Sequence, residues 1–439
     1  MVKTIKNLRD LFGKSSADSG MVSGLIMAYF IFCSLFITLR ILIFGSDTSV
    51  SVVEYIFSSL PEILALFVLL YMILKSDLKL FYRQFSLFDK IIALYILTNV
   101  VYGTILAHDL KLSIYGFRLT YLPMVFYFIV RMWHPSEMEK YEKLIRKISM
   151  WSLTLAIAGL LIYFIFTDFY DYMMAKGNFV EMEYFVRRMG SLFWTPVMFA
   201  SLMTICGLYF YYKALQKGKW IHYLFFGIIW SCLFLTISRG AIISFFFGLV
   251  LLAILMKNWR DFVKSILVMA FVIFCFWMLD KVVTNILAFI FDSAWDTLSM
   301  KRGMTRVELW IHAWNDFLNR PMGYGLGMAG HVAARFFGRY STKAATFSTD
   351  GYYLKMLNET GVWGLFSYLI LMGTYVVQSV KYLRKHQTDF YLFLFVIILV
   401  VAVQNIVSNV NDFYLISSLI WIVIGISQNI YLSWHNEQN

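Results

Sequence analysis

Two arginines and one aspartate have the residue types and settings suited to binding an anion and moving a proton. Arg239 lies in Ser238-Arg239-Gly240 between two apolar runs, where an arginine is costly and usually functional. Arg306 opens a predicted helix, where a guanidinium and free backbone N–H groups together favour a bound anion. Asp350 precedes a predicted membrane span, and a carboxylate at a dry membrane mouth tends toward the raised pKa that a general base needs.

Each of these three residues also has a structural interpretation. Arg239 could belong to a buried ion pair that holds helices together. Arg306 could be a side chain that snorkels to the bilayer surface. Asp350 could cap a helix that starts at Tyr352. The sequence leaves both interpretations open at each position.

Four further arginines are candidate anion-binding residues. Arg118 lies within an apolar run, Arg187 and Arg188 precede another, and Arg302 belongs to a basic segment that begins at Lys301. Structural ion pairs and snorkelling side chains are the alternatives for these positions.

No group of side chains predicts a metal or cofactor site. His312 and His331 stand singly, so no cluster has the spacing of zinc ligands. The glycines at 323, 325 and 327 do not follow a strand, which argues against a dinucleotide or P-loop motif. The cysteines fall inside apolar runs and are expected to pack as small hydrophobic residues; they are Cys33, Cys206, Cys232 and Cys275.

The chain that must position these residues is mostly apolar. It has 439 residues, of which 60% are hydrophobic and 15% charged, whereas a soluble domain is about half apolar and a quarter charged. The formal net charge of +12 would suit nucleic acid, but most basic residues lie in short loops on one side, which membrane orientation explains. The composition predicts an all-α polytopic membrane bundle that forms a single domain over 1–439.

About twelve apolar runs have the length of a membrane-spanning helix, roughly 20 residues. They lie near 21–44, 51–74, 89–107, 113–132, 147–166, 193–213, 220–237, 240–256, 262–281, 361–381, 390–408 and 413–433.

Lysines and arginines in the short loops predict the orientation of the bundle, because cytoplasmic loops are enriched in them. The amino-terminal tail and the loops near 75–90, 131–147, 213–219, 257–264 and 381–385 are basic, whereas those at 45–50, 108–112 and 409–412 are nearly free of positive charge. Both termini are therefore expected to be cytoplasmic. The long segment 282–360, between the ninth and tenth spans, is expected to lie outside.

This outer segment carries an unusual density of positive charge. Between Lys301 and Lys343 there are seven basic residues against Glu308 and Asp316, and a bound anion would explain this excess. Thr305 with Glu308 fits a capping box that opens a helix, and Pro321 would end it. The apolar positions follow helical spacing; they are Val307, Trp310, Ile311, Trp314 and Leu318. We interpret 282–360 as a catalytic loop that contains an amphipathic helix.

Several motifs occur in a recognisable order. Arg188-x-Gly190-Ser191-x-Phe193-x-x-Pro196 is followed by Ser238-Arg239-Gly240 and by Arg306-x-x-x-Trp310. Pro321-x-Gly323-x-Gly325-x-Gly327, then Tyr353-Leu354, then Gly361 with Gly364 complete the series. Together they resemble the O-antigen ligase and O-antigen polymerase superfamily over roughly residues 180–365.

The resemblance implies a glycosyltransferase that joins glycans carried on undecaprenyl diphosphate at the outer face of the bacterial inner (plasma) membrane. It implies that Arg239 and Arg306 hold the diphosphate, with Asp350 as a third catalytic residue. Further substrate contacts would come from Arg118, Arg187, Arg188 and Arg302. Tyr352 and Tyr353 could stack on sugar rings, although an interfacial aromatic belt is an alternative role.

No cofactor, metal or nucleic acid is implied as a partner. The implied partners are the lipid-linked glycan donor and acceptor, membrane lipid, and a flippase and a chain-length regulator of the same pathway.

The residue types favour a polymerase of repeat units within this superfamily. Ligases carry a histidine about four residues before the leucine of Tyr-Leu, and here Asp350 occupies that position. A ligase or O-oligosaccharyltransferase is the nearest alternative. A transporter or flippase for the same lipid-linked glycan is another, but such proteins usually have internal repeats and broken half-helices, which the sequence lacks.

Overall fold

The long apolar runs fold into helices, because in lipid the backbone N–H and C=O groups of a single segment are satisfied by helical hydrogen bonds. The computed structural model describes residues 19–45, 57–75, 85–107, 109–133, 138–176, 188–278, 306–337, 351–386 and 388–438. The first half contains α2 (Ser19–Phe44), α4 (Leu60–Lys75), α6 (Leu87–Ala107), α7 (Leu110–Thr120), η1 (Leu122–Met124), α8 (Val125–Met132), α9 (Met138–Phe164), α10 (Thr167–Lys176), η3 (Ser191–Phe193) and α11 (Pro196–Lys217). The second half contains α12 (Trp220–Leu235), α13 (Arg239–Leu255), α14 (Trp259–Met278), α16 (Arg306–Asn319), α17 (Gly330–Phe337), α18 (Tyr352–Lys385), α19 (Asp389–Val407), η4 (Val410–Asp412) and α20 (Tyr414–Gln438).

A helix in the described part of the chain overlaps each predicted span, which confirms a polytopic helical bundle. By length and composition, eight of the described segments are able to cross a membrane, and α12 and α13 are shorter apolar helices. The four cysteines are free, with Cys275 exposed and the other three buried.

Two predicted spans depart from a single straight helix. The fourth is interrupted between α7 and α8 by the short turn η1, where Pro123 has no N–H to continue the helix. The tenth begins earlier than predicted, at Tyr352, and bends at Gly361, whose φ of 64° and ψ of −158° are not helical. The part of α18 before this bend packs against the loop that connects α16 to α17.

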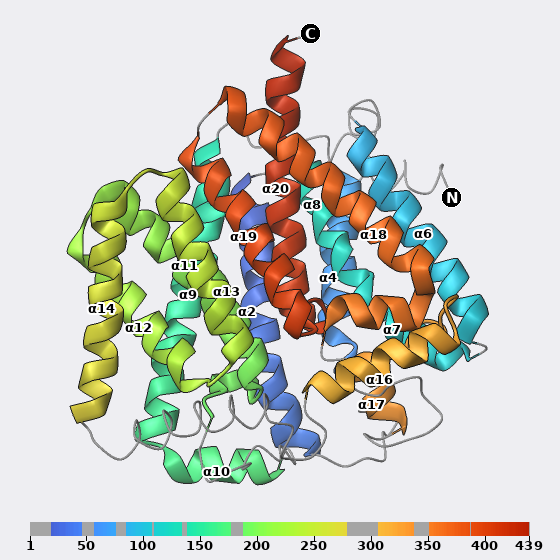
Figure 1. Cartoon of the computed structure of the whole chain (residues 1–439), viewed down its shortest axis with the longest axis horizontal. Coiled ribbons are helices and arrows are strands. Elements are labelled where there is room, and N and C mark those ends of the chain that lie inside the picture. The colour runs from blue at the N-terminus through green and yellow to red at the C-terminus, as the bar shows by residue number, and fades with distance from the viewer. Residues whose placement is uncertain are drawn as a thin grey trace.

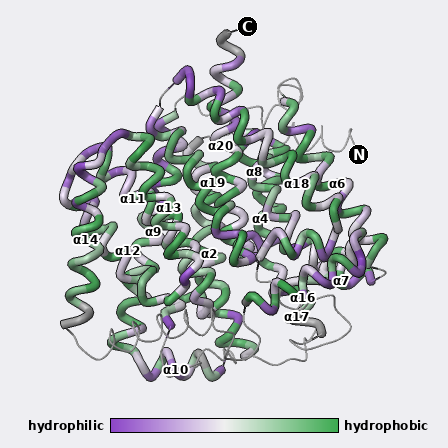
Figure 2. The backbone as a smooth tube through the Cα atoms, viewed as in Figure 1, coloured by the Kyte–Doolittle hydropathy of each residue, from purple (hydrophilic) through white to green (hydrophobic). Residues whose placement is uncertain are grey.

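The bundle has a buried centre and an apolar periphery. Helices α11, α19 and α20 are buried over most of their length. On α6, Leu94, Leu97, Val101 and Ile105 are exposed at helical spacing, and Figure 2 shows hydrophobic residues along the outer helices. An exposed apolar stripe on a long helix is the expected surface for contact with lipid tails.

The two ends of the bundle differ in what they carry. Helices α10, α16 and α17 lie at one end, and α20 projects from the opposite end (Figure 1). We call the first the loop end; it includes η4 and the starts of α7, α13 and α18. We call the second the terminal end; it includes the starts of α6 and α9 and the ends of α8 and α20. The described residues of the segments predicted to be outer loops therefore share one end of the bundle.

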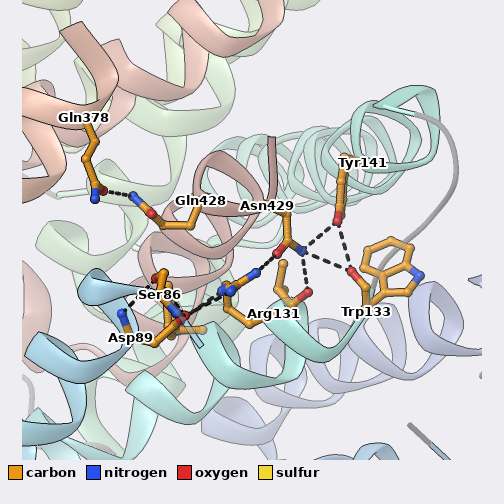
Figure 3. A network of polar contacts seen from close by, with 10 residues as sticks. Ser86, Asp89, Arg131, Trp133, Tyr141, Gln378, Gln428 and Asn429 are labelled. Atoms are coloured by element: carbon orange, nitrogen blue, oxygen red, sulfur yellow. Dashed lines mark hydrogen bonds and ion pairs between the residues drawn. The ribbon is translucent and has the colours of Figure 1, made fainter. Parts of the chain in front are cut away.

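A buried network of polar side chains closes the terminal end (Figure 3). Arg131 donates from Nε to Asp89 Oδ1 and from Nη2 to Asp89 Oδ2, each at 2.9 Å. Its Nη1 donates to Asn429, and Asn429 Nδ2 donates to Tyr141 Oη at 2.7 Å. Arg131, which begins the basic range 131–147, lies in α8 rather than in a loop, and its side chain is fully buried and paired.

Candidate active site

The segment between α16 and α17 is wedged between two helices of the loop end. We call residues 320–329 the glycine loop. Tyr324 N donates to Asn358 O at 2.8 Å and Gly325 N donates to Glu359 O at 2.9 Å, both just before the bend in α18. Leu326 N donates to Gly103 O on α6, also at 2.9 Å. These contacts bind the loop to the bundle through main-chain groups.

The glycine spacing is explained by this packing. Gly323, Gly325 and Gly327 have φ values of 91°, 112° and 82°, a region that side chains with a Cβ rarely adopt. A Cβ on Gly325 would lie 2.2 Å from the Cα of Ala107. The motif therefore fixes the loop between α6 and α18, and through it fixes α16 and α17.

Helix α16 is confirmed and begins at Arg306, as the capping box predicted. On its predicted apolar face, Ile311, Trp314 and Leu318 are exposed. The side that faces the bundle contains Ala313, whose carbonyl accepts from Asn358 Nδ2 at 3.0 Å. The helix lies at the end of the bundle, where an exposed apolar stripe suits the surface of a bilayer.

A group of charged side chains lies directly beneath the glycine loop. We call Thr120, His331, Lys355, Glu359 and Asp412 the Lys355 cluster. Lys355 Nζ lies 2.5 Å from Asp412 Oδ1 and 3.7 Å from Glu359 Oε2. It also donates to Thr120 Oγ1 at 3.0 Å. These contacts bring together α7, α18 and η4.

Main-chain donors hold the second carboxylate of the cluster. Glu359 Oε1 accepts from Gly327 N at 3.0 Å, and Ala329 N also donates to this side chain. A buried carboxylate without such partners would be strongly disfavoured. Glu359 therefore ties the glycine loop to Lys355.

Asp412 is the most enclosed carboxylate of the cluster, with its side chain 0% exposed. Burial alone would raise the pKa of Asp412, but Lys355 and His331 outweigh it and hold that pKa below its ordinary value. The Asp412 carboxylate is therefore charged at neutral pH. His331 Nδ1 lies 3.2 Å from Asp412 Oδ2, and the His331 side chain is 52% exposed.

Arg239 lies after a strained turn that Arg188 supports. Ile237 has a φ of 55°, which is a genuine outlier for a β-branched residue. Arg188 Nε donates to Thr236 O at 3.0 Å, and Met189 N donates to Leu235 O at the same distance. Strained backbone of this kind clusters at functional sites. The structure thus brings two predicted site residues, Arg188 and Arg239, to one turn.

Gly240 packs against the end of another helix. The positive φ at the preceding turn belongs to Ile237. A Cβ on Gly240 would lie 2.5 Å from Val407 Cγ2. Gly240 therefore allows α13 to pack closely on the end of α19.

The connection between α19 and α20 joins the parts of the site. Val407 contacts the position of Gly240, beside Arg239. Asn409 Oδ1 accepts from Gly351 N at 3.2 Å, at the start of α18. Asp412 binds Lys355 and His331. Residues 407–412 thus contact the starts of α13, α17 and α18.

Arg118 is already paired. Its Nε donates to Glu62 Oε1 at 2.5 Å, and its Nη2 donates to Ser58 O. Glu62 already pairs with the positive charge that Arg118 would need to bind a diphosphate. This contact therefore fits the structural ion pair that was the alternative role for Arg118.

The two predicted sugar-stacking tyrosines pack inside the bundle. Tyr352 is 1% exposed, and its ring lies edge-on to that of Tyr368. Tyr353 donates its hydroxyl to Ala402 O at 2.9 Å. The first contact lies within α18, across its bend, whereas the second anchors the start of α18 to α19.

Three predicted site residues lie outside the described residues: Arg187, Arg302 and Asp350. Arg306 is described in its backbone alone, as the first residue of α16. The N-cap residue of α18 is Gly351.

Lys355 and Asp412 were not singled out from the sequence. Lys355 and Glu359 stand four residues apart just before a predicted span, a spacing that places both on one helix face. Asp412 ends a polar run between two apolar ones. Ionisable residues at a membrane border are functional candidates by default, and that signal was available for both.

The fold and the site define a class of protein: a polytopic helical membrane protein with the Lys355 cluster and the turn before Arg239 at the loop end of the bundle. Residues 224–369 match a family model described as O-antigen ligase. The match confirms, over these residues, the resemblance to the O-antigen ligase and polymerase superfamily. The matched residues run from α12 into α18 and include Arg239, the glycine loop, His331 and Lys355. No curated protein matches the chain.

Proposed function

We propose that this protein polymerises oligosaccharide repeat units carried on undecaprenyl diphosphate at the outer face of the bacterial plasma membrane. In this reaction the growing chain leaves its carrier diphosphate and is joined to a hydroxyl of a new unit. The proposal covers the polysaccharides that such units build, whether O-antigen, capsule or exopolysaccharide.

The family match carries this proposal. Within the matched residues, Asp350 stands where the ligases of the superfamily are expected to have a histidine. This departure favours a polymerase over a ligase. A transporter is not favoured, because the glycine loop holds α16 and α17 firmly to the bundle, and transport would require large movements between parts of the bundle.

The arginines at the loop end suit a diphosphate leaving group. Charge builds on the leaving diphosphate in the transition state, and preorganised guanidinium groups in a dry site stabilise that charge. Arg239 follows a turn held by main-chain bonds and by Arg188, which reduces the reorganisation needed during the reaction. Arg306 at the start of α16 would be a second guanidinium, next to the free N–H groups of the first helical turn.

Incubation of the pure protein in detergent or liposomes with a synthetic undecaprenyl-diphosphate repeat unit tests the function. We expect a ladder of products on a gel, spaced by one repeat unit. A single transfer to an added lipid or peptide acceptor, without a ladder, would identify a ligase or oligosaccharyltransferase. Movement of the lipid-linked unit across liposomes, with no covalent product, would identify a transporter.

A further inference from the structure

The described structure offers a proton acceptor that the sequence did not indicate. His331 is a half-exposed residue at the start of α17, and its ring lies beside a fully buried carboxylate. Its Nδ1 faces Asp412 Oδ2 at 3.2 Å. The other ring nitrogen, Nε2, is therefore the one that can exchange a proton with a substrate.

We propose that His331 is the general base of glycosyl transfer and that Asp412 is its positioning residue. The inference rests on the proposed function, because it assigns a role within that reaction. Asp412 accepts the Nδ1 proton of His331, which fixes the tautomer with an unprotonated Nε2. A carboxylate in this position also stabilises the imidazolium that forms when Nε2 takes up a proton.

The step is balanced in atoms and electrons. The acceptor hydroxyl gives its proton to His331 Nε2, and its oxygen forms a bond to the anomeric carbon of the donor. The bond between that carbon and the diphosphate oxygen breaks, and its electron pair leaves with the carrier diphosphate. The proton returns from His331 to solvent, which the half-exposed ring permits.

The other contacts of Asp412 argue that His331 is there for more than structure. Asp412 Oδ1 is already bound to Lys355 at 2.5 Å, and this pair is completely buried. A second partner at the surface adds little to stability, because the exposed side of an ion pair is well screened by water. The arrangement suits a carboxylate that Lys355 holds in place so that its other oxygen can orient His331.

The location of His331 fits the diphosphate site. Asp412 lies in the connection that contacts Gly240 through Val407 and Gly351 through Asn409. Arg239 and the start of α18 border the same connection. The proposed base and the proposed diphosphate ligand are therefore at the same end of the bundle.

The test is the polymerisation assay with His331→Gln, which keeps a polar side chain but cannot accept a proton at this position. General base catalysis contributes roughly 10²- to 10⁴-fold, so we expect kcat to fall at least about a hundredfold. KM for the repeat unit should stay near the wild-type value. His312→Gln is the matched control, because His312 is an exposed histidine on neighbouring α16, and it should leave both constants unchanged.

Chemical rescue separates a proton-transfer role from a structural one. We expect His331→Gly to regain part of its activity when imidazole is added, because a half-exposed site admits a small base. Asp412→Asn should lower kcat with little change in KM. If Asp412→Asn fails to fold, the test of the proposal is the kcat of His331→Gln.

Two results would overturn the inference. One is a His331→Gln variant that makes the ladder within twofold of the wild-type rate. The other is a His331→Gly variant that is slow and that regains no activity when imidazole is added. A wild-type protein that makes no ladder would instead refute the proposed polymerase function, and the role of His331 in polymerisation with it.

Discussion

The network around Arg131 at the terminal end and the Lys355 cluster at the loop end are both buried and charged. They differ in how completely the charges and hydrogen-bonding groups of their members are paired. At the terminal end, one arginine faces one aspartate through two bonds of 2.9 Å, and both side chains are 0% exposed. Asp89 also accepts from Ser86 Oγ at 2.7 Å and from Tyr127 Oη at 2.5 Å. This network is balanced in charge and closed to solvent.

At the loop end, one lysine faces two carboxylates, and a half-exposed histidine completes the group. A buried pair with full hydrogen bonding fixes the geometry of helices, whereas an unequal group with one member at the surface can exchange a proton. The comparison teaches that burial alone does not distinguish an anchor from a site. An anchor and a site are distinguished by the number and sign of their charges and by whether one member reaches solvent.

The largest expected effect concerns the sides of the membrane on which the two ends lie. In a Cys275→Ser background, Asn319→Cys at the loop end should react with a membrane-impermeant maleimide in intact cells. Lys219 is exposed at the opposite end, and Lys219→Cys should react only after the cells are permeabilised. The opposite pattern would mean that the loop end faces the cytoplasm and that the proposed site is on the wrong side.

The second prediction tests the terminal end as an anchor. Arg131→Met leaves Asp89 buried without its cation, and breaking such a pair costs about 3–5 kcal/mol. We expect a large loss of thermal stability in detergent, measured by the melting of purified protein. Lys143→Met is the control, because the pair of Lys143 with Glu139 is exposed; it should melt like the wild type. A stable Arg131→Met variant would show that the network is dispensable.

The third prediction tests the arginines of the loop end. Lysine keeps the charge but lacks the planar two-pronged donor, so Arg239→Lys and Arg306→Lys should each slow polymerisation. A lost charge-assisted bond is worth about 1.5–3 kcal/mol, or roughly ten- to a hundredfold in rate. Arg260→Lys, an exposed arginine at the other end of the bundle, is the matched control. Wild-type rates in both variants, with normal expression, would place the diphosphate elsewhere.

The smallest expected effect concerns Asp350. If His331 is the base, Asp350→Asn should lower the rate by about fivefold, the worth of one hydrogen bond of about 1 kcal/mol. The measurement is the initial rate of ladder formation beside that of His331→Gln. A larger loss in Asp350→Asn than in His331→Gln would assign the base to Asp350 and reduce the Lys355 cluster to a second anchor.

Much of the fold followed from the sequence because its causes are local. Membrane-length apolar runs and the capping box before Arg306 depend on residues that are close together in the chain. They predicted where helices lie and where α16 starts. The motifs around Arg239 and the glycine loop also indicated the superfamily whose ligase model matches residues 224–369, since their order along the chain is itself a sequence property.

The tertiary structure alone decided which charges meet. Lys355 and Asp412 are 57 residues apart, and Arg131 and Asn429 are 298 apart, so no local pattern pairs them. The same reason explains Gly240, whose packing partner Val407 belongs to another helix, and Arg118, whose partner Glu62 lies on α4. Local spacing determines helices because their hydrogen bonds join residues four apart. The environment of a charge depends on all the helices that surround it, and that is fixed when the bundle packs.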